Sequence, residues 1–243
     1  MSSTGSPSSV SSSVSRLVPN QIHKSTTWKT SDNDHKLESP WAIWYDKKTP
    51  FRQVDPISYR SKLVKIGSFD TIESFWKLYV HMKRPSSLEL NVNLYLMRDG
   101  SNHAPLWEAY PRGGCWILKV KKKVDGFSVL GKMWQDLVFA TIGEAFEEPD
   151  VVGISLCIRK NEDLISVWNS DSRNPDIKFN IAESMKKILD LEPDTVIEFK
   201  YHAESMKDLS TFRNAKAYVQ ITETGSSSKA SEAPTKVEEE TSK

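Results

Sequence analysis

Two apolar runs separated by a short polar turn most constrain the fold of this chain. Residues 151–158 and 164–168 are rich in β-branched and other apolar side chains, and the polar segment Lys160–Asp163 lies around the turn between them. Two strands joined by so short a turn pair as an antiparallel hairpin, because parallel neighbours need a much longer crossover. The pattern therefore favours an antiparallel sheet.

Further strands are predicted on both sides of this hairpin. In residues 88–100, Leu90, Val92, Leu94 and Leu96 alternate with polar side chains, and the run ends in an Asp-Gly turn. Strand-like patterns also occur in residues 41–48, 59–67, 115–123, 195–202 and 214–222. Strands thus outnumber helices, and hairpins dominate their order.

Helical spacing of apolar residues appears in three segments. These are residues 69–83, 125–148 and 175–191. The first opens with Asp70 and Glu73, a spacing similar to that of a capping box. The predicted fold class is α+β: a single curved antiparallel β-sheet backed by three α-helices on its convex face.

Both ends of the chain differ in composition from the segment between them. Residues 1–34 are dominated by serine, and residues 222–243 are polar and lack an apolar period. Neither end has enough apolar surface to offset the entropy lost on ordering, so both are predicted to be disordered tails. Residues 35–221 form the predicted domain, which is long enough for a sizeable core.

Charge and cysteine content narrow the functional classes. The formal net charge is +1, so nucleic acid is not expected to be held mainly through phosphates, and any such role needs a local site. The two cysteines cannot form a disulfide framework, which favours a reducing compartment. No membrane span or secretory signal is predicted, because the sequence has no apolar run of sufficient length.

Common catalytic motifs do not occur in the sequence. There is no GxxxxGK[ST], GxGxxG, HExxH, CxxC or GxSxG pattern. The five histidines are scattered and share no metal-ligand spacing. The chain is therefore expected to be neither an enzyme nor a metal or cofactor protein.

Tryptophan is unusually frequent for so polar a chain. Eight tryptophans occur in a sequence with a mean hydropathy of −0.50. The surplus over the needs of a core suggests that some indoles bind a flat ligand. Trp107 is followed directly by Glu108, so a stacking surface and a hydrogen-bond acceptor lie side by side. This pair predicts recognition of an electron-poor ring that donates hydrogen bonds.

A set of motifs in a fixed order resembles the eukaryotic translation initiation factor 4E family, the mRNA cap-binding proteins. The motifs are WAIWY (41–45), FDTIESFW (69–76), PLWE (105–108), RGGCW (112–116), IGE (142–144) and IRKNEDLISVWN (158–169). The resemblance spans about 35 to 221. It implies a cupped antiparallel sheet backed by three helices and a 7-methylguanosine ligand, in agreement with the pattern above.

The resemblance implies where the base of that ligand binds. Trp107 stacks on one face of the base, and Glu108 accepts hydrogen bonds from the guanine edge. Trp168 packs beside the methyl group. Tyr59 occupies the place of the family's usual first tryptophan, as in the second class of the family, the 4E homologous proteins; the alternative stacking residue is Phe51. For Trp107 the alternative role is a buried core anchor, and for Trp168 it is plain sheet packing.

The implied phosphate contacts are fewer than in the family pattern. Cys115 and Leu164 replace two basic residues of that pattern. Arg159 remains as the expected triphosphate ligand, while Lys160 is expected to point to the opposite face. A loop over 207–216, with Lys207 and Arg213, is expected to close over the phosphates.

The resemblance also implies a partner site on the convex face. There, the family binds a short helix with a Tyr-x-x-x-x-Leu-apolar motif, supplied by the scaffold initiation factor 4G or by inhibitory 4E-binding proteins. The residues carried over are His35, Leu37, Ile72, Trp76, Asp136, Phe139 and Gly143. Lys36 and Gln135 depart from the family pattern and leave the preferred partner open.

Two functions are consistent with these patterns. The first is a cytoplasmic, non-enzymatic cap-binding factor that recruits a scaffold partner to mRNA in translation initiation. The second is a weak cap-binding regulator or adaptor that acts through other partners of the convex face, since Tyr59 and Cys115 reduce the expected cap affinity.

Overall fold

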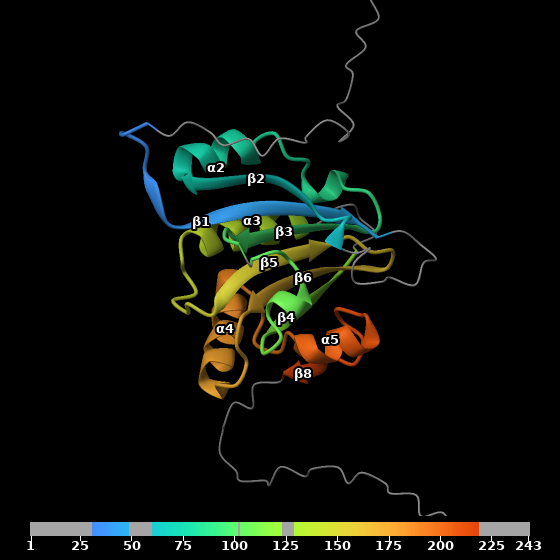
Figure 1. The fold of residues 1–243 in the computed structure, drawn as a ribbon. Coiled ribbons are helices and arrows are strands. Elements are labelled where there is room, and N and C mark those ends of the chain that lie inside the picture. The colour runs from blue at the N-terminus through green and yellow to red at the C-terminus, as the bar shows by residue number, and fades with distance from the viewer. Residues whose placement is uncertain (1–30, 49–59, 102, 123–128, 219–243) are drawn as a thin grey trace, which may run out of the picture.

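One eight-stranded antiparallel sheet organises the chain (Figure 1). The computed structural model describes residues 31–48, 60–101, 103–122 and 129–218. In spatial order the strands are β2-β1-β3-β5-β6-β4-β7-β8, and each neighbouring pair is antiparallel. Their bounds are β1 (Lys36–Lys47), β2 (Val64–Thr71), β3 (Val92–Arg98), β4 (Gly114–Lys121), β5 (Val151–Cys157), β6 (Glu162–Asn169), β7 (Ile197–Tyr201) and β8 (Lys216–Tyr218). The predicted antiparallel sheet is confirmed.

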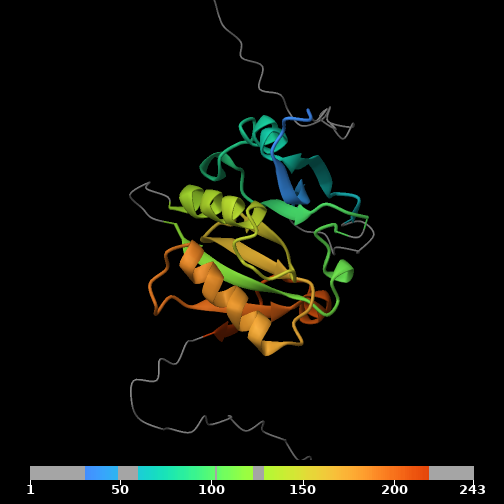
Figure 2. The same cartoon turned by 90° about the vertical axis from the view of Figure 1, so that its left-hand side faces the viewer.

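Three helices cover one face of this sheet, as the sequence predicts. They are α2 (Ile72–Tyr79), α3 (Leu130–Ile142) and α4 (Pro175–Ile188) (Figure 2). A fourth helix, α5 (His202–Asp208), was not predicted. It packs against β4, β7 and the short 3-10 helix η2 (Trp107–Ala109). Its first residue, His202, contacts Trp168 on the sheet face opposite the three longer helices.

The sheet separates two clusters of buried side chains. The cluster on the helix side includes Trp41, Leu96, Trp116, Leu137 and Ile165. The cluster on the opposite side includes Tyr95, Met97, Cys115, Ile117 and Trp168. The central strands are therefore covered on both faces, and successive residues of each strand contribute to different clusters.

Strand β3 shows how this double burial differs from the sequence pattern. The alternation in 88–100 predicts a polar face, yet Val92–Met97 is buried throughout. Asn93, on that polar side, is only 6% exposed. Leu90 lies before the strand and is half exposed, so the strand begins two residues later than the alternation suggests.

The cap of α2 also differs from the predicted one. Thr71, not Asp70, is the N-cap, because its backbone is extended and its Oγ1 accepts a hydrogen bond from the Ser74 N–H at 3.1 Å. The Ser74 hydroxyl accepts in return from the Thr71 N–H at 3.0 Å. These two bonds form the capping box, and Glu73 instead binds His35.

Two further segments are shorter or shifted relative to the sequence prediction. The strand expected over 59–67 is observed as β2, from Val64 to Thr71. The helix expected over 125–148 is observed as α3, which ends at Ile142 and is capped by Gly143. Turns with positive φ at Glu144 and Glu147 follow this cap, so the helical pattern does not continue.

Some predictions concern residues beyond those described. Residues 1–30 of the predicted N-terminal tail and the whole predicted C-terminal tail, 222–243, lie outside the described residues, and so do Trp28, Phe51 and Tyr59. Both cysteines are buried and free. Within the described part of the chain, no helix combines the length and the apolar character that crossing a membrane requires.

Arg98 joins the end of α3 to the sheet, and its loss should destabilise the protein. Its guanidinium binds both carboxylate oxygens of Glu144 at 2.8 and 2.6 Å and lies 4.8 Å from the Trp41 ring. Arg98→Met leaves Glu144 without its partner, and we expect the free energy of unfolding to fall by about 3 kcal/mol in urea titrations.

Lys132→Met is the matched control, because Lys132 forms an exposed ion pair with Asp136 within α3. We expect little change there, since exposed ion pairs contribute little to stability. Equal losses in the two variants would contradict the role given to Arg98.

Candidate functional site

A pocket opens on the sheet face that the three long helices do not cover. Its walls come from β1, β3, β5, β6, η2 and the segment after α5. The lining residues are Asp46, Lys47, Lys48, Lys62, Asn93, Tyr95, Trp107, Glu108, Ser155, Cys157, Arg159, Trp168, Leu209, Ser210, Thr211 and Phe212. Four residues singled out from the sequence, Trp107, Glu108, Arg159 and Trp168, thus meet in one pocket.

Trp107 and Glu108 form one rim of this pocket. Both lie in η2, in the connection between β3 and β4, and the Tyr110 N–H closes the turn on the Trp107 carbonyl at 3.0 Å. Trp107 is partly buried against the cluster under the pocket, while Glu108 is exposed. Trp107 is therefore not a fully buried core anchor, and an indole face and a carboxylate are available to a ligand.

Trp168 belongs to the floor of the pocket. It is 3% exposed, and its indole N–H donates to the Ser155 hydroxyl at 3.0 Å. Its ring meets the Tyr95 ring edge-on, with centroids 6.2 Å apart, and lies 4.8 Å from the His202 ring. Trp168 can thus offer van der Waals contact to a ligand, but its polar hydrogen already has an acceptor.

Arg159 is held in place by the neighbouring strand. Its Nη2 donates to Asn93 Oδ1 at 2.7 Å, and its Nη1 donates to the Ile158 carbonyl at 3.0 Å. The Arg159 N–H donates to Asp163 Oδ1 at 2.9 Å. These bonds restrain the guanidinium at the pocket, which lowers the entropy lost when it binds an anion.

Asp46 and Asn93 complete this network, and both were missed by the sequence analysis. Asn93 Nδ2 donates to Asp46 Oδ1 at 2.7 Å, so one amide links Asp46 to Arg159. Asp46 is 2% exposed, and burial raises its pKa. The sequence does carry a signal for both residues: Asp46 and Asn93 are polar residues within strands otherwise rich in apolar side chains, a pattern that can mark a functional site.

A buried lysine fixes the segment that closes the pocket beside α5. Lys200 is fully buried, and its ammonium donates to both oxygens of Asp208 at 2.8 and 2.6 Å. It also donates to the carbonyls of Ser210, at 2.8 Å, and Arg213. Although burial alone would raise the pKa of Asp208, the bonds from Lys200 hold it below its usual value. Residues 209–212 are thereby anchored against the pocket.

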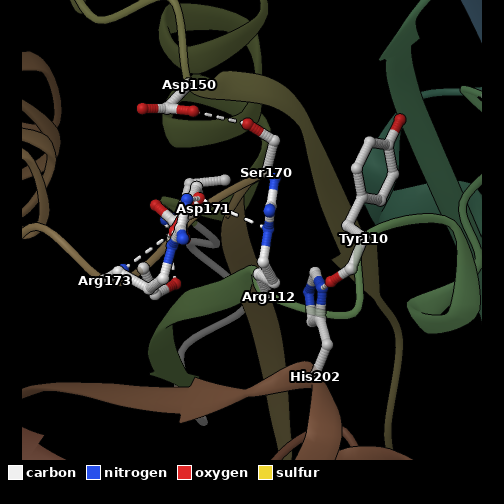
Figure 3. A network of polar contacts seen from close by, with 9 residues as sticks. Tyr110, Arg112, Asp150, Ser170, Asp171, Arg173 and His202 are labelled. Carbon is white, nitrogen blue, oxygen red and sulfur yellow. Dashed lines mark hydrogen bonds and ion pairs between the residues drawn. The ribbon is translucent and has the colours of Figure 1, made fainter.

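Cys115 contacts a buried histidine and is not among the residues that line the pocket. His202 Nδ1 lies 2.9 Å from the Tyr110 carbonyl (Figure 3). His202 Nε2 lies 3.2 Å from Cys115 Sγ. Burial lowers the pKa of His202 to about 4, so the ring is neutral; Nδ1 then donates to the carbonyl and Nε2 accepts from the thiol. Burial also raises the pKa of Cys115, which keeps the thiol protonated.

Two predicted phosphate ligands do not line the pocket. Lys207 lies in α5, where the sequence predicted a loop, and borders a separate hollow with Arg112 and Arg173. Both arginines contact Asp171 there, Arg112 at 3.5 Å (Figure 3). The side chain of Arg213 is exposed, and the pocket wall is formed by the residues just before it. The reason is that α5 continues through Lys207 and turns its side chain away from the pocket.

Other cations occupy the mouth of the pocket. Lys47, Lys48 and Lys62 line it together with Arg159. Lys47 also forms an ion pair with Glu89. Lys160 lies in the exposed turn after Arg159 and is not a lining residue. No sequence motif marks the lysines at 47, 48 and 62 as ligands.

The helix side carries a second surface, centred on Trp76. Trp76 and Ile72 are each 44% exposed and lie one turn apart on α2, so they present adjacent apolar surface to solvent. The Trp76 ring packs edge-on against Phe139 of α3, with centroids 5.6 Å apart. The other residues predicted for this surface have the following places: His35 pairs with Glu73, Leu37 packs on the core, Asp136 pairs with Lys132, and Gly143 caps α3.

Comparisons with known protein sequences identify relatives. The family model described as eukaryotic initiation factor 4E matches residues 36–217. Eukaryotic translation initiation factor NCBP of Triticum aestivum is 38% identical over 183 residues, which cover 74% of this chain and 75% of that protein. Eukaryotic translation initiation factor 4E-4 of Caenorhabditis elegans is 32% identical, with coverage of 75% and 84%.

Solved structures of eukaryotic initiation factor 4E proteins are also similar to this chain. The complex of Ascaris suum eIF4E-3 with m7G cap has a TM-score of 0.62 and 32% identity, covering 71% of this chain and 94% of that chain. The complex of C. elegans eIF4E-3 with the 4E-binding protein Mextli and cap analog has a TM-score of 0.63 and 27% identity, covering 72% and 96%.

The neutral, buried His202 should make stability depend on pH. Its pKa is 6.5 when unperturbed and about 4 in the folded protein, so only the unfolded chain takes up a proton between these values. We therefore expect the free energy of unfolding to fall as pH drops below 6.5, by up to about 1.4 kcal/mol per pH unit from this group.

Urea unfolding at a series of pH values measures this effect. His202→Asn should flatten the pH dependence in that window, whereas the same change at the exposed His81 should leave it as in the wild type. An unchanged slope in His202→Asn would contradict the assignment.

Proposed function

This chain belongs to the eukaryotic initiation factor 4E family, and from that membership and its pocket we propose that it binds the 7-methylguanosine cap of mRNA. The observation that carries the proposal is the convergence of Trp107, Glu108, Trp168 and Arg159 on one pocket. These residues offer, in order, a stacking face, an acceptor for the base edge, an apolar contact and a phosphate ligand. The solved relative from Ascaris suum is a complex with m7G cap.

The methylated base is flat and positively charged, which matches the rim of the pocket. A cation over an indole gains on the order of 2 kcal/mol when the pair is desolvated. Trp107 supplies that face, and Tyr59 is the proposed second stacking residue. Glu108 then accepts hydrogen bonds from the guanine edge, and these charge-assisted bonds discriminate guanine from adenine.

The phosphates of the cap are proposed to bind at Arg159 and the nearby lysines. Arg159 is already oriented by Asn93, and Lys48 and Lys62 line the same pocket. Cys115 and Leu164 are each 2% exposed and offer no positive charge. This arrangement supports a phosphate site that is shifted toward β1 relative to the family pattern.

The surface around Trp76 is proposed to bind an amphipathic helix with a Tyr-x-x-x-x-Leu-apolar motif. An exposed indole beside Phe139 and Ile72 provides the apolar anchor that helix-in-groove recognition needs. One solved relative is a complex with the 4E-binding protein Mextli. Because the sheet separates this surface from the pocket, one molecule has room for a cap and a partner together.

Cap and partner binding together support a non-enzymatic, cytoplasmic role in translation initiation, in which the protein brings a scaffold such as initiation factor 4G to the mRNA. The second candidate is a translational regulator with weaker cap binding. The buried, neutral side chains at Cys115 and Leu164 favour it, because they replace basic residues of the family pattern.

Retention on 7-methyl-GTP resin tests the cap proposal. Free 7-methyl-GTP should compete and GTP should not. Trp107→Ala should weaken binding at least about 30-fold, the equivalent of roughly 2 kcal/mol. Glu108→Gln removes the charged acceptor and should weaken binding by about tenfold or more. Wild-type protein that fails to bind the resin at low salt would refute the proposal.

The two surfaces should be separable by mutation. Trp76→Ala removes the exposed anchor and should weaken binding of a Tyr-x-x-x-x-Leu peptide by roughly 30-fold or more, as measured by calorimetry. The same variant should keep its affinity for 7-methyl-GTP, and Trp107→Ala should keep its affinity for the peptide. Loss of cap binding in Trp76→Ala would contradict the assignment of two independent surfaces.

A further inference from the structure

A buried carboxylate lies in the wall of the pocket. Asp46 is 2% exposed, belongs to β1 and pairs across the sheet with Asn93. Its Oδ1 accepts hydrogen bonds from Asn93 Nδ2 at 2.7 Å and from the Tyr95 hydroxyl at 3.2 Å. Both donors are neutral, so they orient the carboxylate without cancelling its charge.

The cations near Asp46 act on it through space only. The charges of Arg159 and Lys48 lower the pKa of Asp46, but less than burial raises it. The Arg159 guanidinium itself binds Asn93 Oδ1 and the Ile158 carbonyl, and Lys47 pairs with Glu89. Among the ion pairs of the described residues, none includes Asp46. A buried carboxylate without an ion pair costs free energy, and burial accordingly raises the pKa of this group.

Such a charge is unfavourable for a ligand that is only anionic, because it repels phosphates. It is favourable for a ligand whose base is positively charged. Asp46 is joined to the floor of the pocket through Tyr95, whose ring meets Trp168 edge-on. Glu108 adds a second negative charge from the rim. A cationic base in this pocket is therefore exposed to two carboxylates, and their attraction does not require direct contact.

We propose that Asp46 is a specificity-determining residue that favours the positively charged, N7-methylated guanine over neutral guanine. The inference rests on the proposed cap-binding function and adds a second anionic group to it. Glu108 accepts hydrogen bonds from the edge of the base, and methylated and unmethylated guanine share most of that edge. Asp46 attracts the positive charge that only the methylated base carries.

The hydrogen bonds of Asp46 also allow an alternative role, in which Asp46 only positions Arg159. Through Asn93, Asp46 is connected to Arg159, so its loss could alter the position of the phosphate ligand. That role changes the affinity for the triphosphate more than the affinity for the monophosphate. A role in sensing base charge weakens the binding of both methylated ligands relative to GTP, because both carry the charged base.

Affinities for 7-methyl-GTP, 7-methyl-GMP and GTP at neutral pH test the proposal. Asp46→Asn keeps the shape of the side chain and removes its charge. Asp46→Ser provides a second neutral variant if the first is poorly folded, and thermal melts verify both. Asp99→Asn is the matched control, because it removes a carboxylate that binds Lys65 and does not line the pocket.

The Asp46 variants should lower the ratio of 7-methyl-GTP to GTP affinity by roughly tenfold, and they should weaken the binding of 7-methyl-GMP as well as that of 7-methyl-GTP. Asp99→Asn should keep the wild-type ratio. Equal changes for 7-methyl-GTP and GTP, or a loss confined to the triphosphate, would overturn the role of Asp46 while the proposed function stands. Wild-type protein that does not prefer 7-methyl-GTP would overturn both.

Discussion

The alternation of side chains along the central strands determines both the core and the pocket. Strands β3, β5, β6 and β4 lie in the middle of the sheet and are covered on both faces. Because successive residues point to opposite sides, Leu96 packs under the helices while Tyr95 and Met97 face the pocket side. A shift of register by one residue in any of these strands would exchange the two sets. The binding surface thus depends on the pairing that builds the core.

Buried polar groups on the pocket side are joined by hydrogen bonds. Asp46, Asn93 and Lys200 are all nearly inaccessible, and each has hydrogen-bond partners. Such networks are costly when incomplete and rigid when complete. Here they hold Arg159 on one side of the pocket and residues 209–212 on the other. The pocket is therefore organised before a ligand arrives, which lowers the entropy cost of binding.

Several features could be predicted from the sequence because they depend on local patterns. The hairpin of β5 and β6, the three long helices and the exposed Trp76 follow from apolar periodicity and from the family resemblance. Trp107 and Glu108 were recognisable because the pair is adjacent in sequence.

Features that depend on distant contacts could not be predicted in this way. The network of Asp46, Asn93 and Arg159 joins residues of two strands and a turn that are far apart in the chain. Helix α5 is short, and its position depends on His202, which is buried between Tyr110 and Cys115. The sequence does not reveal these contacts of His202, so it predicts a loop over the pocket at Lys207. In the structure Lys207 belongs to α5 and borders another hollow.

A structure of the protein bound to 7-methyl-GTP would show where the cap binds. We expect the methylated base to stack on Trp107, with its edge at Glu108 and its phosphates toward Arg159. A base bound elsewhere, or phosphates placed in the hollow of Arg112, Arg173 and Lys207, would contradict this expectation.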